Sequence, residues 1–332
     1  MAYAKLSGAL LVRKDAPITE AVSVPRIPAA ASPPPAAVAV TAAPDPAPAA
    51  ALPVAAPPPP HIALPATAAD AEKLLADHLK ALKLPTFLSQ YATLAEQCAA
   101  EGLDPSHYLL RLAELELGER QRQVTERRIK AARFPAVKEL DGFDFAAVPT
   151  LDQEAIRELA NCDYIARNEN IIAVGNSGTG KTHLAIGLGV EACRKGVSVR
   201  FITAASLVHE LLEASDERRL LRLQRRLASY RLLIIDELAY APLSAVGADL
   251  LFDVVSQRYE RGSTIITSSL PFEEWISVFG TAQLTGAVLD RLVHYAHILE
   301  VRGESYRLKQ SRLQLHGREL GRETQLAQLS SG

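Results

Sequence analysis

The sequence is poor in cysteine and aromatic residues, and it has no long apolar run. Its 332 residues include 3 cysteines and 1 tryptophan, and aromatic residues make up 5%. Cys98, Cys162 and Cys193 stand far apart without C-x-x-C spacing, so neither a zinc ribbon nor a disulfide framework is indicated. No window reaches the roughly 18 consecutive apolar residues of a membrane-spanning helix. The composition therefore predicts a soluble, cytoplasmic protein with no membrane partner.

The net charge is only −2, and the proline content is concentrated at one end of the chain. Residues 1–68 hold 15 of the 21 prolines, with long alanine tracts and almost no aromatic side chains. Such a segment cannot bury enough apolar surface to offset the entropy lost on ordering. We therefore expect residues 1–68 to be a disordered Pro/Ala-rich leader.

The most informative motif is a complete G-x-x-x-x-G-K-[ST] match that directly follows the apolar run 171–174. Its residues are Gly175, Asn176, Ser177, Gly178, Thr179, Gly180, Lys181 and Thr182. In this arrangement the glycines let backbone N–H groups and the next helix N-terminus surround an oligophosphate. We expect Lys181 to reach the β/γ-phosphates of ATP and Thr182 to offer its hydroxyl to Mg²⁺, with His183 beside them in the nucleotide-binding set.

A second motif, Asp236-Glu237, follows the apolar run 232–235 about 50 residues later. The apolar run indicates a buried parallel strand that ends in two carboxylates. We expect Asp236 to contribute to Mg²⁺ binding and Glu237 to act as the base that polarises the attacking water. The adjacent glutamate favours hydrolysis over phosphoryl transfer to a small acceptor.

Residues 70–133 show helical spacing of apolar side chains, with a helix start at Asp104-Pro105. The last part is basic: between Glu119 and Arg133, six basic residues against two acidic ones give +4. The basic residues are Arg120, Arg122, Arg127, Arg128, Lys130 and Arg133. This charge suits the phosphate backbone of double-stranded DNA, although a solvated helix face has a similar composition. A second basic cluster at 218–226 is open to interpretation as a DNA contact, a subunit contact or a charged surface.

From Asn168 onward, strand and helix patterns alternate, which predicts an α/β fold with a parallel sheet covered on both faces. The expected strands are 170–174, 197–202, 231–235, 263–268 and 298–302, and the expected helices are 181–195, 205–228, 245–261 and 283–295. Both motifs fall at carboxyl ends of strands, where open α/β sheets bind ligands.

Several further blocks occur in a recognisable order. They are Ala131–Pro135, Gly178–Ala185, Asp236–Leu238, Arg258–Glu260, Thr267–Trp275, Asp290–Leu292 and Ser305–Arg307. Over about residues 75–315, the chain resembles the IstB-like helper ATPases of bacterial insertion sequences, relatives of the DnaC-type helicase loaders and the DnaA initiators.

This resemblance implies an AAA+ P-loop ATPase domain over 151–315, with a central parallel sheet. It also implies a preceding helical domain over 69–150 that carries the basic DNA-contacting helix, and a flexible tail over 316–332. Such proteins assemble on DNA with ATP as homo-oligomers, assist a partner transposase, and disassemble as ATP is hydrolysed.

The resemblance also assigns roles to two further residues. Ser269 corresponds to the sensor of the γ-phosphate, where the family usually has asparagine; we expect the shorter hydroxyl to slow hydrolysis and to leave ATP binding intact. Arg291 corresponds to an arginine finger that reaches a neighbouring subunit. From the residues alone, an i, i+4 type surface ion pair is the favoured explanation of Arg291.

Two alternatives to the transposition helper remain at this stage. One is a DnaC-like loader of a replicative helicase. The basic helix and the Phe134-Pro135 block modestly favour the transposition helper over this loader. The other is a nucleotide-dependent DNA scaffold with little hydrolysis, which Ser269 keeps open.

Overall fold

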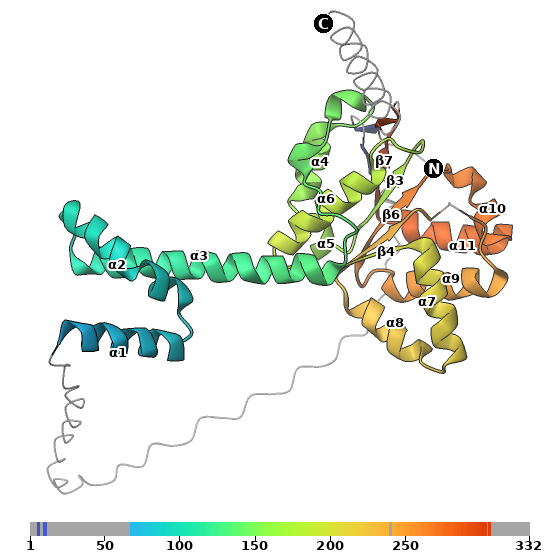
Figure 1. The fold of residues 1–332 in the computed structure, drawn as a ribbon. Coiled ribbons are helices and arrows are strands. Elements are labelled where there is room, and N and C mark those ends of the chain that lie inside the picture. The colour runs from blue at the N-terminus through green and yellow to red at the C-terminus, as the bar shows by residue number, and fades with distance from the viewer. Residues whose placement is uncertain (1–4, 7–8, 12–66, 239–240, 304, 307–332) are drawn as a thin grey trace, which may run out of the picture. The chain divides into compact units, whose positions relative to one another are not determined.

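A computed structural model describes residues 5–6, 9–11, 67–238, 241–303 and 305–306 (Figure 1). These residues form two compact units, one over 67–116 and one that joins residues 5–6 and 9–11 to the described part of 117–306. The sequence predicts a boundary at about residue 150, whereas the units divide inside a long helix. The division lies earlier because Ala132, Phe143 and Val148 are buried in the same apolar cluster as the strands.

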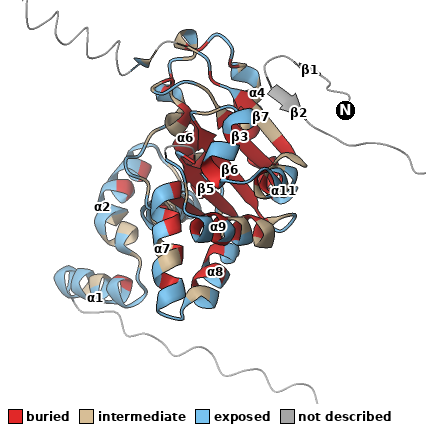
Figure 2. Ribbon diagram, turned by 90° about the vertical axis from the view of Figure 1, so that its right-hand side faces the viewer, coloured by how far each residue is buried: buried red, intermediate tan, exposed pale blue. Residues whose placement is uncertain are grey.

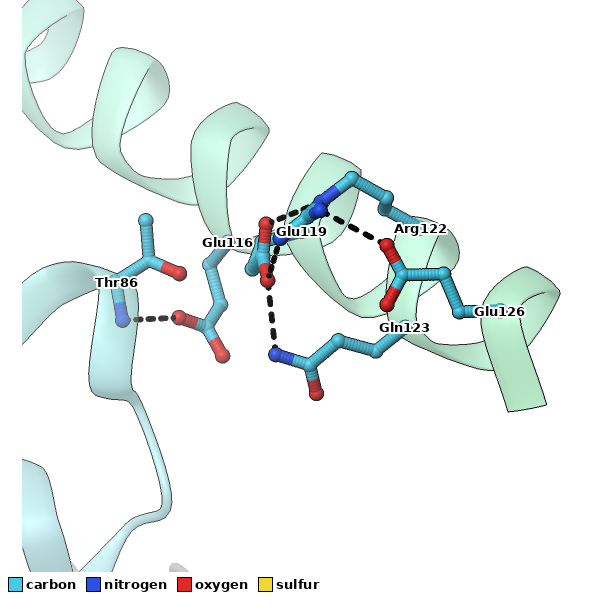
Figure 3. Close-up of polar contacts among 6 residues, drawn as sticks. All are labelled: Thr86, Glu116, Glu119, Arg122, Gln123 and Glu126. Atoms are coloured by element: carbon cyan, nitrogen blue, oxygen red, sulfur yellow. Dashed lines mark hydrogen bonds and ion pairs between the residues drawn. The ribbon is translucent and has the colours of Figure 1, made fainter. Parts of the chain in front are cut away.

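The smaller unit is helical. It contains α1 (Ala68–Ala81), α2 (Pro85–Ala100) and the first part of α3 (Pro105–Ala132). Asp104 begins α3 as its sequence indicates, because its carboxylate accepts the backbone N–H groups of Ser106 and His107 at 2.8 and 3.1 Å. The buried Glu116 accepts the N–H of Thr86 in the first turn of α2 at 3.0 Å (Figure 3). A carboxylate at a helix N-terminus is electrostatically favourable, so Glu116 ties α3 to α2.

The larger unit is built on five parallel strands, as predicted. They are β3 (Asn170–Val174), β4 (Val199–Thr203), β5 (Leu232–Asp236), β6 (Ser263–Ser268) and β7 (Ala296–Glu300). Their order in the sheet is β7-β3-β6-β5-β4, with every neighbouring pair parallel. The carboxyl ends of β3, β6 and β5 therefore lie side by side at one edge of the sheet.

Helices cover both faces of this sheet because the strand side chains alternate between two apolar clusters. Ile171 and Ala173 belong to the cluster on one face, and Ile172 belongs to the cluster on the other. Figure 2 shows the strands buried between helices whose outer sides are exposed. The first face is covered by α4 (Gln153–Ala160), α5 (Asp163–Ala166) and α6 (Lys181–Arg194). The second is covered by α7 (Ala204–Asp216), α8 (Leu220–Ser229), α9 (Ala245–Arg258), α10 (Ile276–Phe279) and α11 (Ala282–Val293).

Most expected elements differ from the observed bounds by one to three residues, and two of the differences are informative. The sequence predicts one helix over 205–228, but the chain breaks at Arg218, whose φ is +57°, to form α7 and α8. Leu211 of α7 and Leu227 of α8 are buried in one cluster, and the break lets both helices bury their apolar faces there. Strand β7 begins at Ala296 instead of residue 298, because the preceding helix ends at Val293.

Two short segments differ from the expectation of disorder over 1–68. Strand β1 (Lys5–Leu6) pairs antiparallel with β2 (Ala9–Leu11), and β2 pairs antiparallel with β7. The backbone N–H and C=O groups of β7 would otherwise lie unpaired at the sheet edge, so a short added strand satisfies them. Residues 12–66 and the expected tail over 316–332 lie outside the described part of the chain. Within that part, no helix combines the length and apolar character needed to cross a membrane.

Candidate nucleotide-binding site

The loop between β3 and α6 has a backbone that requires glycine at its motif positions, as Gly175 and Gly180 illustrate. A side chain at Gly175 would overlap the carbonyl oxygen of Val301. Gly180 has a φ of +101°, and a Cβ there would lie 2.6 Å from the ring of Phe143. Helix α6 then begins at Lys181, so its unpaired N-terminal N–H groups lie at the loop. This is the local geometry of an anion-binding turn.

The Lys181 ammonium lies inside the loop and is largely buried. Its Nζ donates hydrogen bonds to the carbonyl oxygens of Gly175 and Asn176, both at 2.6 Å. Thr179 is also buried, and its hydroxyl donates to the Asn176 carbonyl at 2.9 Å. The loop therefore holds a positive charge beside the helix N-terminus, in position to bind phosphate oxygens.

The predicted Mg²⁺ residues meet across the strand ends. The Thr182 hydroxyl, in the first turn of α6, lies 2.9 and 3.1 Å from the two carboxylate oxygens of Asp236, the buried last residue of β5. These are hard oxygen ligands, and Mg²⁺ in nucleotide sites is bound by one or two such groups together with phosphates and waters. No cluster of three or more His, Cys, Asp or Glu side chains suited to a metal occurs among the described residues. The described side chains therefore do not form a metal site built from protein ligands alone.

Thr267, on the adjacent strand β6, is a site residue that the sequence reasoning missed. Its hydroxyl donates to Asp236 Oδ1 at 2.6 Å and accepts the backbone N–H of Glu237 at 2.9 Å. Its side chain is buried at the carboxyl end of the strand. The available signal was its place in the Thr267–Trp275 block, directly before the two serines. A single hydroxyl thus fixes both members of the Asp-Glu pair.

Glu237 itself is exposed and has a φ of +57°. This conformation is uncommon for a residue other than glycine and costs on the order of 1–3 kcal/mol. The hydrogen bond from its N–H to Thr267 holds it there, and Glu237 lines the cavity beside the phosphate loop. The strained backbone therefore places a carboxylate next to the loop.

The loop and the strand ends border a cavity of about 470 Å³, within the usual size of a small-molecule site. Its remaining wall comes from residues outside these two motifs: Lys138, Gly142, Phe143, Asp144, Ala147, Val148 and Tyr306. His183 connects α6 to this wall, since its Nε2 lies 2.9 Å from the Glu139 carbonyl oxygen and its ring meets Phe143 edge-on. Apart from Tyr306, which belongs to the Ser305–Arg307 block, neither regular periodicity nor a local pattern marks these residues in the sequence.

The two residues assigned by resemblance lie in different places. Ser269 follows β6 and lines the cavity. Arg291 on α11 does not line it; its Nη1 donates to the Ala287 carbonyl at 2.9 Å, and its Cζ lies 4.6 Å from the centroid of the Phe252 ring. No carboxylate of the described residues lies within ion-pair distance of Arg291, so the alternative of a surface ion pair is not formed there.

The phosphate loop after β3, the Asp-Glu pair after β5 and the parallel sheet with helices on both faces define an AAA+ P-loop protein that binds ATP. The sequence profile of the family described as IstB-like ATP binding protein matches residues 77–314. The chain belongs to this family.

Individual relatives agree with this assignment. A protein of Geobacillus stearothermophilus named for insertion sequence IS5376 and for ATP binding is 41% identical over 233 residues, which are 70% of this chain and 93% of the relative. A Pseudomonas aeruginosa protein named for insertion sequence IS21 and ATP binding is 40% identical over 234 residues, with 70% and 88% covered. Among solved structures, AMPPCP-bound DnaA from Aquifex aeolicus is similar at 20% identity and a TM-score of 0.44, with 55% of this chain and 56% of that chain covered.

Proposed function

We propose that the protein hydrolyses ATP with Mg²⁺, assembles with ATP on double-stranded DNA as a homo-oligomer, and assists a partner transposase. The observation that carries the proposal is the network of Thr182, Asp236, Thr267 and Glu237 beside the phosphate loop. The relatives' names, which refer to insertion sequences, support the link to transposition. Phosphate release by the purified protein, measured with and without double-stranded DNA, tests hydrolysis and its dependence on assembly. Transposition by a candidate partner transposase, measured with and without this protein, tests the partner.

Each site residue has a distinct part in this proposal. Lys181 and the N-terminus of α6 bind the β- and γ-phosphates, while Thr182 and Asp236 hold Mg²⁺, which neutralises phosphate charge when bound. Glu237 accepts a proton from the attacking water, and Thr267 keeps Glu237 and Asp236 in place. Ser269 lies where it can contact the γ-phosphate.

Glu237→Gln should bind ATP like the parent and hydrolyse it about 10²–10⁴-fold more slowly, because an amide keeps the shape of the side chain but cannot act as a base. Nucleotide titration and steady-state phosphate release measure the two quantities. Glu154→Gln, which changes an exposed acid on α4 outside the cavity, is the matched control and should retain both. Parental turnover by Glu237→Gln would show that Glu237 is not the base.

Thr267→Val should lower turnover by about ten- to a hundredfold, because it removes one of the hydroxyl donors to the buried Asp236 carboxylate and the side-chain acceptor of the Glu237 N–H. Thr267→Ser keeps the hydroxyl and should stay within about threefold of the parent, given the small change in packing. The comparison uses phosphate release at saturating ATP, with thermal unfolding to verify that both variants fold. Equal rates for the valine and serine variants would show that the Thr267 hydroxyl does not contribute to turnover.

The basic part of α3 supports DNA as a partner, although its charges are not equivalent. Arg122 is held between Glu119 and Glu126 at 2.8 and 2.9 Å, so its charge is already offset (Figure 3). Arg127 and Lys130 are exposed, and neither forms an ion pair with a described residue. We therefore assign the phosphate contacts of this helix to its last two turns.

The second basic cluster lies close to the end of α3. The ring of Phe134, just beyond α3, packs 6.1 Å from that of Phe201 on β4. Next to Phe201, Arg200 shares Glu210 with Arg226 of α8, at 3.3 and 3.5 Å. Burial lowers the pKa of the Arg200 guanidinium, Glu210 raises it, and the nearby charges of Arg133 and Arg226 lower it. The two clusters are thus neighbours in space, and α8 is available to extend a DNA contact.

Salt dependence distinguishes these basic residues. Log affinity for DNA should fall against log salt by about 0.9 for each phosphate contact, so Arg127→Ala/Lys130→Ala should flatten the slope by about two units on any DNA sequence. Arg122→Ala is the control on the same helix and should flatten it by less, because its charge is offset. An unchanged slope in the double variant would move the contact to α8, where Arg222→Ala/Arg225→Ala provides the next measurement.

A further inference from the structure

We infer that Phe252 is a positioning residue whose ring holds the Arg291 guanidinium in place for the ATP site of a neighbouring copy of this chain. The inference rests on the proposed role of Arg291 as a finger acting between subunits. It adds a residue that has no polar group of its own and lies outside the cavity of its own subunit.

The geometry of the contact is that of a cation on an aromatic face. Arg291 Cζ lies 4.6 Å from the centroid of the Phe252 ring, inside the roughly 6 Å limit for such interactions. Phe252 is partly buried and packs against the apolar cluster beneath α9 and α11, which anchors its ring. The Nη1 bond to the Ala287 carbonyl, one turn earlier on α11, fixes the other side of the guanidinium. Two rigid helices therefore define where this half-buried group points.

The two groups that hold Arg291, the Phe252 ring and the Ala287 carbonyl, are important for their chemistry as well as for their position. A ring face and a carbonyl oxygen are both uncharged, so the guanidinium keeps its full positive charge. Other arginines of this unit are held by acids, as Arg167 is by Glu169 at 2.9 Å and Arg194 is by Glu191 at 2.6 Å. A carboxylate would hold Arg291 equally firmly, but it would offset the charge that a finger brings to a phosphoryl group. Asp290 is exposed beside Arg291, and no ion pair joins the two.

Two substitutions separate the effect of the aromatic face of Phe252 from the effect of its apolar volume. Phe252→Leu keeps apolar volume and loses the aromatic face, and it should lower turnover on DNA by about five- to thirtyfold with ATP affinity unchanged. Phe252→Tyr keeps the face and should stay within about twofold of the parent. Thermal unfolding of both variants verifies that the fold is kept. Equal turnover by the leucine and tyrosine variants would overturn the inference.

Mixed assemblies test whether the defect belongs to the neighbouring site. Phe252→Leu subunits have an intact phosphate loop and Glu237, whereas Glu237→Gln subunits have an intact finger but little turnover of their own. With excess Glu237→Gln, turnover per Phe252→Leu subunit should rise to the parental value, because most of its neighbours then supply a well-held Arg291. A defect in folding within the Phe252→Leu subunit would not recover. If Arg291→Ala recovers in the same mixture and Phe252→Leu does not, the role of Phe252 is wrong; if neither recovers, the proposed finger itself fails.

Discussion

Lys181→Ala should lose measurable ATP binding, with affinity reduced by about a hundred- to a thousandfold, and with it ATP-dependent assembly on DNA. Removing one partner of a buried charge pair typically costs about 2–5 kcal/mol, and the β- and γ-phosphates would lose their principal side-chain cation. In the structure the ammonium lies inside the loop, 2.6 Å from two of its carbonyl oxygens. With alanine at this position, the two carbonyl oxygens would face the negatively charged phosphates with no cation between them. Titration with a fluorescent ATP analogue measures the affinity directly.

Lys195→Ala is the matched control for this result. Lys195 caps the far end of the same helix, α6, and donates to the Asn161 carbonyl at 2.8 Å, away from the cavity. Its removal deletes an equal charge from the protein and should leave ATP affinity unchanged. Parental affinity in Lys181→Ala, or an equal loss in Lys195→Ala, would contradict the phosphate-loop assignment.

Arg291→Ala should bind ATP nearly as the parent does and hydrolyse it about 10³–10⁵-fold more slowly, the range found when an arginine finger is removed. The structure is consistent with this separation, because Arg291 lies outside the cavity of its own chain and so should contribute little to ATP affinity. Arg291→Lys keeps the charge without the planar fork of the guanidinium, and its turnover should fall between those of the parent and Arg291→Ala. Phosphate release on DNA and nucleotide titration provide both measurements.

Mixing decides whether Arg291 acts between subunits. Arg291→Ala protein has an intact phosphate loop, and Glu237→Gln protein has an intact finger, so a junction between them should hydrolyse ATP although each variant alone does not. Co-sedimentation on DNA verifies that the two assemble together. Turnover that never rises across a titration of co-assembled variants would assign Arg291 a local role on α11, with the Phe252 ring and the Ala287 carbonyl as its only partners among the described residues.

Local sequence patterns were sufficient to predict those parts of the fold and the site that lie within a few consecutive residues. The apolar runs predict strands β3 and β6 with their observed bounds, 170–174 and 263–268, and they predict β5, which precedes the Asp-Glu pair, to within one residue. The glycines of the phosphate loop could be recognised because a backbone that surrounds phosphate excludes side chains wherever the motif occurs. The predicted helix over 205–228 failed at Arg218, because the break is imposed by packing against the sheet and not by the sequence of the helix.

The sequence by itself determined the AAA+ P-loop class, the family, and the residues that begin the site: the phosphate loop, Asp236 and Glu237. These depend on short-range backbone geometry and on the alternation of apolar residues. Only the tertiary structure brought Thr267 of β6 against Asp236 of β5, and only it placed Phe252 of α9 over Arg291 of α11. Each of these contacts joins segments about 30 to 40 residues apart, and the order of strands and the packing of helices decide which segments meet. A hydroxyl or a phenyl ring has no signature of its own, so its part in a site appears only when its neighbours are known.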